Sequence, residues 1–142
     1  GADFIYGHTE FRGGDFRGVV RAWDFAILWK TMVFTHQSLF SRAAVLKPRG
    51  FDLRFRVCAD YDMIYNAWAQ GRTFQPSDVV IASFHPGFSE ASRARMAWEK
   101  WRVVRRHRRD PAFHLFYLQL FLRRAAHDVR LRLRRGKGVG GP

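Results

Sequence analysis

Three segments of the chain carry the acidic, imidazole, amide and hydroxyl side chains with which enzymes transfer protons and bind polar substrates. They span residues 35–42, 50–63 and 82–89. The second segment holds two carboxylates one residue apart, Asp60 and Asp62, at the start of an apolar helical pattern. A carboxylate there can serve as a general base, but an Asp at a helix start more often only caps the helix. On the residues alone, both interpretations of the pair stay open.

Histidines stand in the other two segments. His36 is followed directly by Gln37 and Ser38, and His85 follows a β-branched run. A single histidine is more often a structural residue than a ligand, and His85 before Pro-Gly can simply close a turn. The polar neighbours of His36 give a functional role there equal weight. The only cysteine, Cys58, excludes an intrachain disulfide and a zinc site built from several thiolates, and we expect it to be buried as a small apolar residue.

Taken together and in this order, the segments resemble the second half of bacterial family 2 glycosyltransferases that build surface polysaccharides. The likeness covers residues 3–92. The family has the GT-A fold, so it implies an α/β fold, here an incomplete GT-A (Rossmann-like) half with few strands. The matching stretches are His-Gln-Ser at 36–38, Gly-Phe-Asp at 50–52, Ala-Asp-Tyr-Asp at 59–62, and a strand that ends at His85 before a turn.

The resemblance implies a role for each matched residue. Asp60 corresponds to the catalytic base of inverting members, which deprotonates the acceptor hydroxyl. Asp62 corresponds to the second acidic position, which supports the site or contacts the acceptor. The substrate-binding loop near the donor diphosphate and the acceptor corresponds to His36, Gln37 and Ser38.

His85 corresponds to a position that lies beside the metal and the diphosphate in many GT-A enzymes, so the resemblance implies a substrate and metal contact there. The complete enzyme should use Mg²⁺ or Mn²⁺ at an Asp-x-Asp that ends an earlier strand, but no Asp-x-Asp precedes His36 in this sequence. The chain also has Tyr6-Gly7-His8 where Tyr-Gly-Asp is expected. We therefore expect part of a glycosyltransferase, inactive by itself, that moves a sugar from a nucleotide-diphosphate sugar to a saccharide or polyprenyl-linked acceptor.

The elements that must position these residues follow from local patterns. A Gly13-Gly14-Asp15 turn predicts a hairpin-like excursion over residues 3–20, residues 24–34 fit either helix or buried strand, and residues 51–58 read as an irregular link. We expect Ser38 and Asp60 to cap helices and Gly71 to end one. The sequence shows only two or three strands, whereas an open sheet usually has about four to six. This shortage indicates that the chain is part of a larger domain. Strands are predicted at 3–7 and 79–84, and helices at 38–46, 60–70, 90–109 and 111–135.

The positive charge is concentrated in the C-terminal third. The net charge of the whole chain is +13; residues 1–92 hold 10 Lys or Arg and 9 Asp or Glu, whereas residues 93–142 hold 15 and 3. Any partner that recognises charge should therefore bind the tail. We expect the acceptor-side part of the catalytic domain over 1–92, a hairpin of basic amphipathic helices over 93–135 and a flexible tail over 136–142.

The tail has three interpretations. An apolar run at 113–122 lies between arginine clusters, so residues 110–137 fit an anionic membrane surface, a packing helix with a solvated basic face, or nucleic acid. Nucleic acid ranks last because the body carries no known reader motif. The alternative function is accordingly a non-catalytic α/β module with a basic tail. We expect a cytoplasmic protein without a signal peptide or a membrane-spanning segment, held peripherally at the inner face of the cell membrane. A sheet edge without a partner strand is compatible with a homodimer.

Overall fold

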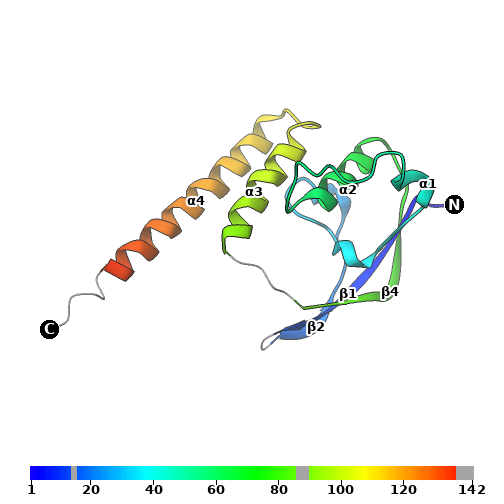
Figure 1. Cartoon of the computed structure of the whole chain (residues 1–142), viewed down its shortest axis with the longest axis horizontal. Helices are drawn as coiled ribbons and strands as arrows, with labels where there is room; N and C mark the ends of the chain where they lie inside the picture. The colour runs from blue at the N-terminus through cyan, green and yellow to red at the C-terminus, as the bar shows by residue number, and fades with distance from the viewer. Residues whose placement is uncertain (14–15, 86–89, 137–142) are drawn as a thin grey trace. The chain divides into compact units, whose positions relative to one another are not determined.

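The computed structural model describes the backbone of residues 1–13, 16–85 and 90–136. It describes the side chains of the same residues except 16, 90–93 and 128–136. The chain forms two compact units, Gly1–His107 and Arg108–Pro142. The described part is a mixed α/β structure with four strands and four α-helices, coloured along the chain in Figure 1. The predicted α/β class is therefore confirmed.

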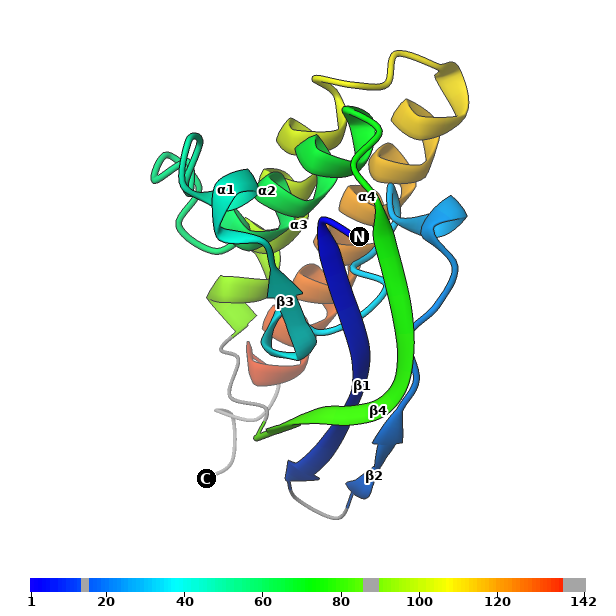
Figure 2. The same ribbon diagram turned by 90° about the vertical axis from the view of Figure 1, so that its right-hand side faces the viewer.

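The sheet is organised around β1 (Phe4–Gly13). On one side, β1 pairs antiparallel with β3 (Leu39–Ser41) near its start and with β2 (Phe16–Val20) near its end. On the other side it pairs in parallel with β4 (Phe74–Phe84). Figure 2 shows β1 between β3 and β4. The hairpin predicted over residues 3–20 is confirmed by the β1–β2 pairing, while its Gly14-Asp15 tip lies outside the described residues.

Both predicted strands are longer in the structure, because β1 and β4 pair over most of their length. β4 begins at Phe74, whose ring stacks on Phe4 at a centroid distance of 4.5 Å, and it runs through Pro76. Proline is tolerated because β4 has one described partner only, so its missing N–H can face away from the ladder. At Gly7 the two strands come very close. A Cβ there would lie 2.5 Å from the carbonyl oxygen of Val79, so only glycine fits.

The helix predicted over residues 38–46 is wrong for its first half. The chain instead forms the 3₁₀ turn η2 (His36–Ser38), then β3, and only then the short helix α1 (Ala43–Leu46). Ser38 does not cap a helix: its hydroxyl donates to the carbonyl of Thr35. Pairing of β3 with β1 overrides the local helical spacing. Residues 24–34, whose sequence fits either a helix or a buried strand, form neither. They contain the 3₁₀ turn η1 (Phe25–Ile27) and further turns.

α2 (Ala59–Ala69) matches the helix predicted over residues 60–70. Its N-cap residue is Cys58, so Asp60 lies in the first turn rather than at the cap. Gly71 follows the helix with φ of 75°, the left-handed conformation expected of a terminating glycine. The inward face of α2 forms much of the core of the first unit; its buried residues are Tyr61, Asp62, Met63, Ile64, Tyr65 and Ala67.

α3 (Glu90–Val104) belongs to the first unit, so the compact units divide at residue 107 rather than at the predicted boundary after residue 92. The reason is packing: α3 contacts α2 and contributes buried Ala97, Val103 and Val104 to the core. Burial of apolar side chains on one face of a helix fixes that helix to its sheet or helix partner. The basic segment therefore starts inside the globular body.

α4 (Pro111–Gly136) forms the second unit. Its start is as predicted, because the carboxylate of Asp110 accepts a hydrogen bond from the Phe113 backbone at 3.0 Å and Pro111 takes the first helical position. Arg108 holds the same carboxylate from outside the helix at 2.7 Å. Within the described residues, no helix is both long and apolar enough to cross a membrane. The tail at 137–142 lies outside the described residues.

Candidate functional site

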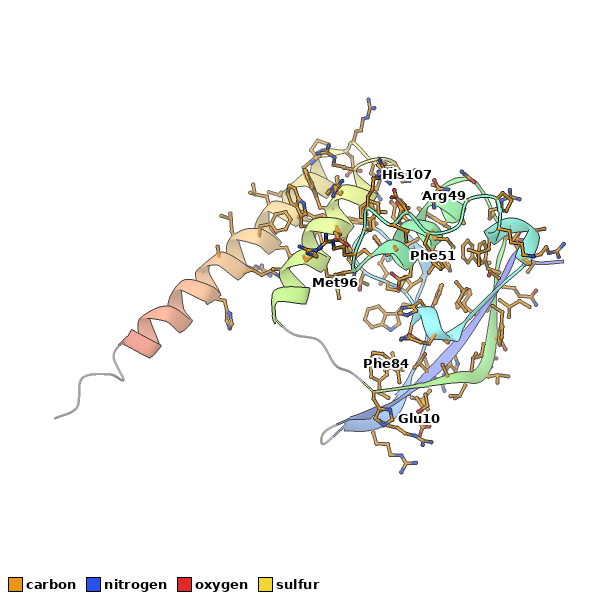
Figure 3. The ribbon with its side chains drawn as sticks, viewed as in Figure 1. Glu10, Arg49, Phe51, Phe84, Met96 and His107 are labelled. Atoms are coloured by element: carbon orange, nitrogen blue, oxygen red, sulfur yellow. The ribbon has the colours of Figure 1, made fainter. Side chains whose placement is uncertain are left out.

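The first unit contains an open pocket of about 460 Å³. Its walls come from β1, β2, the segment that precedes η2, the start of α2 and the face of α3. Figure 3 shows two of its lining residues, Phe84 at the end of β4 and Met96 on α3. Most of the lining is apolar, as in pockets that bind small molecules. The apolar lining residues are Phe11, Val20, Trp23, Met32, Val33, Phe34, Val57, Phe84 and Met96.

An imidazole–carboxylate pair lies at this pocket. His36 Nδ1 donates to Asp60 Oδ2 at 2.6 Å, and both residues line the pocket. The other carboxylate oxygen, Oδ1, accepts from the backbone N–H of Tyr61 at 2.8 Å. The Asp60 carboxylate raises the pKa of His36 above its ordinary value, because the hydrogen bond favours the imidazolium. Of the predicted site residues, the pocket brings together His36, Gln37 and Asp60.

The His36 side of the pair is held by a cluster of hydroxyl groups. The side chains of Thr9, Thr35 and Ser38 bond to one another, and Ser38 is fully buried. The backbone N–H of Ser38 also donates to the Thr35 carbonyl at 2.9 Å, which closes the η2 turn. Ser38, predicted to bind substrate, therefore lies beneath the loop and does not line the pocket. Its role in our account is to position His36.

The Asp60 side of the pair is held by Glu99 of α3. The Glu99 carboxylate is 4% exposed and accepts hydrogen bonds from the backbone N–H groups of Arg56, Val57 and Cys58 at 3.2, 2.9 and 3.0 Å. These three residues lead directly into α2. Without Glu99, these N–H groups would lose their acceptor, and that of the buried Cys58 would be left without a partner. Glu99 therefore fixes the link from which Asp60 projects.

Asp62 points away from the pocket. Its side chain is fully buried, with one oxygen 2.7 Å from Arg49 and the other 2.9 Å from Arg106. Arg106 also reaches Asp52 at 3.5 Å. Both carboxylate oxygens are therefore occupied by guanidinium groups, and the residue lies outside the pocket lining. We assign Asp62 to the support of α2 and not to a contact with substrate.

His85 stands apart from the pair. It is exposed just after β4 and is not part of the pocket lining. The turn that follows it, at residues 86–89, lies outside the described residues. No group of three or more His, Cys, Asp or Glu side chains that could hold a metal occurs in the described part of the chain. The substrate and metal contact of His85 remains a prediction.

Two basic side chains and one thiol complete the pocket. Lys100 and Arg21 line it, and Lys100 Nζ lies 5.3 Å from the ring centroid of Tyr61. Cys58 also lines the pocket, and burial raises the pKa of its thiol to about 12. A thiol with so high a pKa is not a nucleophile near neutral pH. The chemistry of the pocket therefore centres on His36 and Asp60.

Sequence reasoning missed Glu99, although a signal was present. In α3 it stands three residues after the half-buried Met96 and four residues before the buried Val103, which is the spacing of a helix face that packs inward. A carboxylate on a buried stripe needs partners, which points to a structural or functional contact. The sequence could not identify those partners, because they are backbone groups some forty residues away.

Changing Glu99 to glutamine should destabilise the fold. Glutamine keeps the size of the side chain but loses the charge and one acceptor oxygen, so we expect the free energy of unfolding to fall by about 2–3 kcal/mol. Urea unfolding followed by circular dichroism measures this. Glu10→Gln, on the exposed hairpin beside Arg12, is the matched control and should change little. Equal stability of the two variants would contradict the role assigned to Glu99.

No protein-family model, curated protein or solved structure matches this chain. The fold and the pocket define a mixed α/β protein with an imidazole–carboxylate pair in an apolar pocket. A proposal about its family rests on the sequence motifs and on the geometry of this pair.

Proposed function

We propose that this chain is the acceptor-side part of a family 2 glycosyltransferase of the hexosyltransferase type. The reaction transfers a sugar from a nucleotide-diphosphate sugar to a hydroxyl group of a saccharide or polyprenyl-linked acceptor. The observation that carries the proposal is the position of Asp60, the residue matched to the catalytic base: it lies in the first turn of α2, at the wall of a pocket, and is bonded to His36.

The chemistry requires a base at this point. The acceptor oxygen bonds to the anomeric carbon of the sugar while the bond from that carbon to the diphosphate breaks, and the hydroxyl proton must leave. A sugar hydroxyl is a poor nucleophile, and a positioned base contributes about 10²–10⁴-fold to such a step. Asp60 provides the carboxylate. Its side chain is 24% exposed, so it can be reached from the pocket while remaining largely shielded from water.

The pocket suits a sugar acceptor in size and lining. Its volume of about 460 Å³ lies within the range usual for small-molecule sites. Apolar and aromatic walls, including Trp23 and Phe84, provide broad contact surfaces. A few polar groups, among them His36 and Gln37, can then orient hydroxyl groups. Such a combination favours an acceptor with both apolar and hydroxyl-bearing faces.

The donor side and the metal belong to residues outside this sequence in our proposal. Mg²⁺ or Mn²⁺ would neutralise the leaving diphosphate, held by the Asp-x-Asp that the resemblance implies upstream. The described residues contain no group of three ligands that fits such an ion. We therefore derive no step through a metal on this chain, and we expect the chain to be inactive without its nucleotide-binding half.

The proposal is tested by measuring transfer. The protein, extended by the residues encoded before Gly1, would be incubated with a panel of nucleotide-diphosphate hexoses and saccharide or polyprenyl-linked acceptors. Product masses would be followed by mass spectrometry. We expect one donor to raise an acceptor mass by one hexose residue. Absence of product, together with absence of nucleotide binding to the extended protein, would contradict the proposal.

A second proposal concerns the tail, which we assign to an anionic membrane surface. Three leucines of α4, Leu115, Leu118 and Leu122, are 53–61% exposed and spaced as one helical face. Arg123 and Arg124 follow them directly, and more arginines continue along the helix. Apolar side chains that enter the interface beside basic groups are typical of helices that lie on anionic bilayers.

Vesicle flotation measures this property. The wild-type protein should float with vesicles that contain anionic lipid, and replacing the three leucines with serine should abolish flotation. Leu53→Ser is a matched control, because Leu53 is 85% exposed in the first unit and should not affect binding. Flotation of the triple variant equal to that of the wild type would overturn the membrane proposal.

A further inference from the structure

The geometry points to His36 as the group that receives the acceptor proton, with Asp60 as the carboxylate that orients it. This inference rests on the proposed function, because it requires an acceptor hydroxyl in the pocket. It differs from what the resemblance implies, in which the carboxylate alone is the base. Three features of the pair carry it: the tautomer of the imidazole, the occupancy of the carboxylate and the exposure of the two groups.

The hydrogen bond fixes the tautomer of His36. Nδ1 lies 2.6 Å from Asp60 Oδ2, and a carboxylate can only accept, so the imidazole proton is on Nδ1. In the neutral ring, Nε2 then carries a lone pair and is a proton acceptor. No other described residue bonds to His36 in the structure. The lone pair is therefore available to a hydroxyl group in the pocket.

Asp60 is the less accessible of the two groups. One of its oxygens accepts from His36 and the other accepts from the Tyr61 backbone. Its side chain is 24% exposed, whereas that of His36 is 51% exposed. The imidazole is thus both easier to reach and intrinsically more basic.

Neighbouring segments fix the positions of His36 and Asp60, and nearby groups affect the pKa of His36. η2 is closed by the Ser38–Thr35 contacts and the link before α2 is held by Glu99, so both partners project from fixed backbone. Asp60 raises the pKa of His36 above its ordinary value, because the hydrogen bond favours the imidazolium that forms when the ring takes up a proton. Burial of the ring opposes this effect and lowers the pKa. Lys100 from α3 and Arg21 from the segment after β2 are the basic groups that also line the pocket.

The proton balance of the step is simple. The acceptor O–H bond breaks as its oxygen bonds to the anomeric carbon, and an N–H bond forms at His36 Nε2. The sugar–phosphate bond breaks, and the nucleoside diphosphate leaves with its electron pair. The imidazolium is stabilised by Asp60, which stays ionised, and later releases its proton to water. The carboxylate acts on the ring as the aspartate of a serine-hydrolase triad does.

Nitrogen-15 NMR of the 142-residue protein tests the pair without any assay of activity. We expect neutral His36 to carry its proton on Nδ1 and its pKa to lie above that of an ordinary histidine. Asp60→Asn should lower this pKa, because the charged acceptor is lost. The exposed His114 is the control, and Asp60→Asn should leave its nitrogen signals unchanged. A neutral His36 protonated on Nε2, or a titration that Asp60→Asn leaves unchanged, would overturn the inference.

Kinetics of the extended protein test the role in transfer. His36→Gln should lower kcat by about 10²–10⁴-fold and remove the fall in rate on the acid side of the pH profile, since that fall reports protonation of Nε2. If Asp60→Asn abolishes transfer while His36→Gln keeps kcat and the acid limb, the inference is wrong and the proposed function stands. If the wild type transfers no sugar at all, both are wrong.

Discussion

Asp60→Asn should lower transfer by about 10²–10⁴-fold in the extended protein while nucleotide-sugar binding stays intact. The amide cannot carry the negative charge that drives removal of the acceptor proton, whether the proton moves to Asp60 itself or to His36. Asparagine keeps the shape of the side chain and an oxygen that can accept from the Tyr61 backbone. The effect should therefore appear in kcat and not in stability.

Steady-state rates and thermal unfolding, measured on the same preparations, separate the two effects. Asp78→Asn is the matched control, because the Asp78 side chain is fully exposed on β4 and takes no part in the pocket. It should leave both kcat and the melting temperature unchanged. An Asp60→Asn variant that turns over at the wild-type rate would remove Asp60 from the catalytic centre.

Asp62→Ala should lower the free energy of unfolding by about 3–5 kcal/mol, the usual cost of removing one partner from a buried ion pair. Asp62 is fully buried, and its loss removes the carboxylate that pairs with Arg49 and Arg106, leaving Arg106 only its 3.5 Å ion pair with Asp52 among the described residues. Arg49 comes from the segment after α1, and Arg106 comes from the turn that follows α3. The variant should therefore loosen the packing of both around α2.

Urea unfolding measures the change, with Asp78→Ala as the exposed control. Should Asp62→Ala fail to fold, Asp62→Asn provides the second measurement, because it keeps one acceptor oxygen and should lose less stability. A loss below about 1 kcal/mol, the size expected of a surface pair, would contradict the structural role of Asp62. It would also reopen a direct contact between Asp62 and substrate.

Local signals predicted the elements that local interactions determine. The β1–β2 hairpin follows from its glycine turn, α2 from its apolar face and from Gly71, and the start of α4 from Asp110 and Pro111. In each case the residues that decide the structure are neighbours in sequence. The α/β class could therefore be derived from the chain alone.

Contacts between distant segments decided the rest. Residues 39–41 have helical spacing but form β3, because β1 offers backbone partners. α3 reads as part of a basic tail but is fixed to the first unit by Glu99, whose partners lie some forty residues earlier. In neither case does the local sequence identify the distant partner. Pairing partners across a sheet cannot be inferred without knowing the fold.

The candidate site was predicted in part. The pattern singled out His36, Gln37 and Asp60, which line one pocket. It could not distinguish them from Ser38 and Asp62, whose side chains are fully buried. In each motif some residues line the pocket and others are buried in the core, and only the structure shows which. The apolar walls of the pocket could not be predicted from the sequence, because their residues come from six separate segments of the chain.

The measurement that tests the central claim most directly is the sequence of the transcript that encodes Gly1, read through the codons before it. Our account predicts a nucleotide-binding βαβ region there, with an Asp-x-Asp at the end of one of its strands. Together with residues 1–107, that region would complete a glycosyltransferase domain. A preceding reading frame that encodes neither feature would contradict the account.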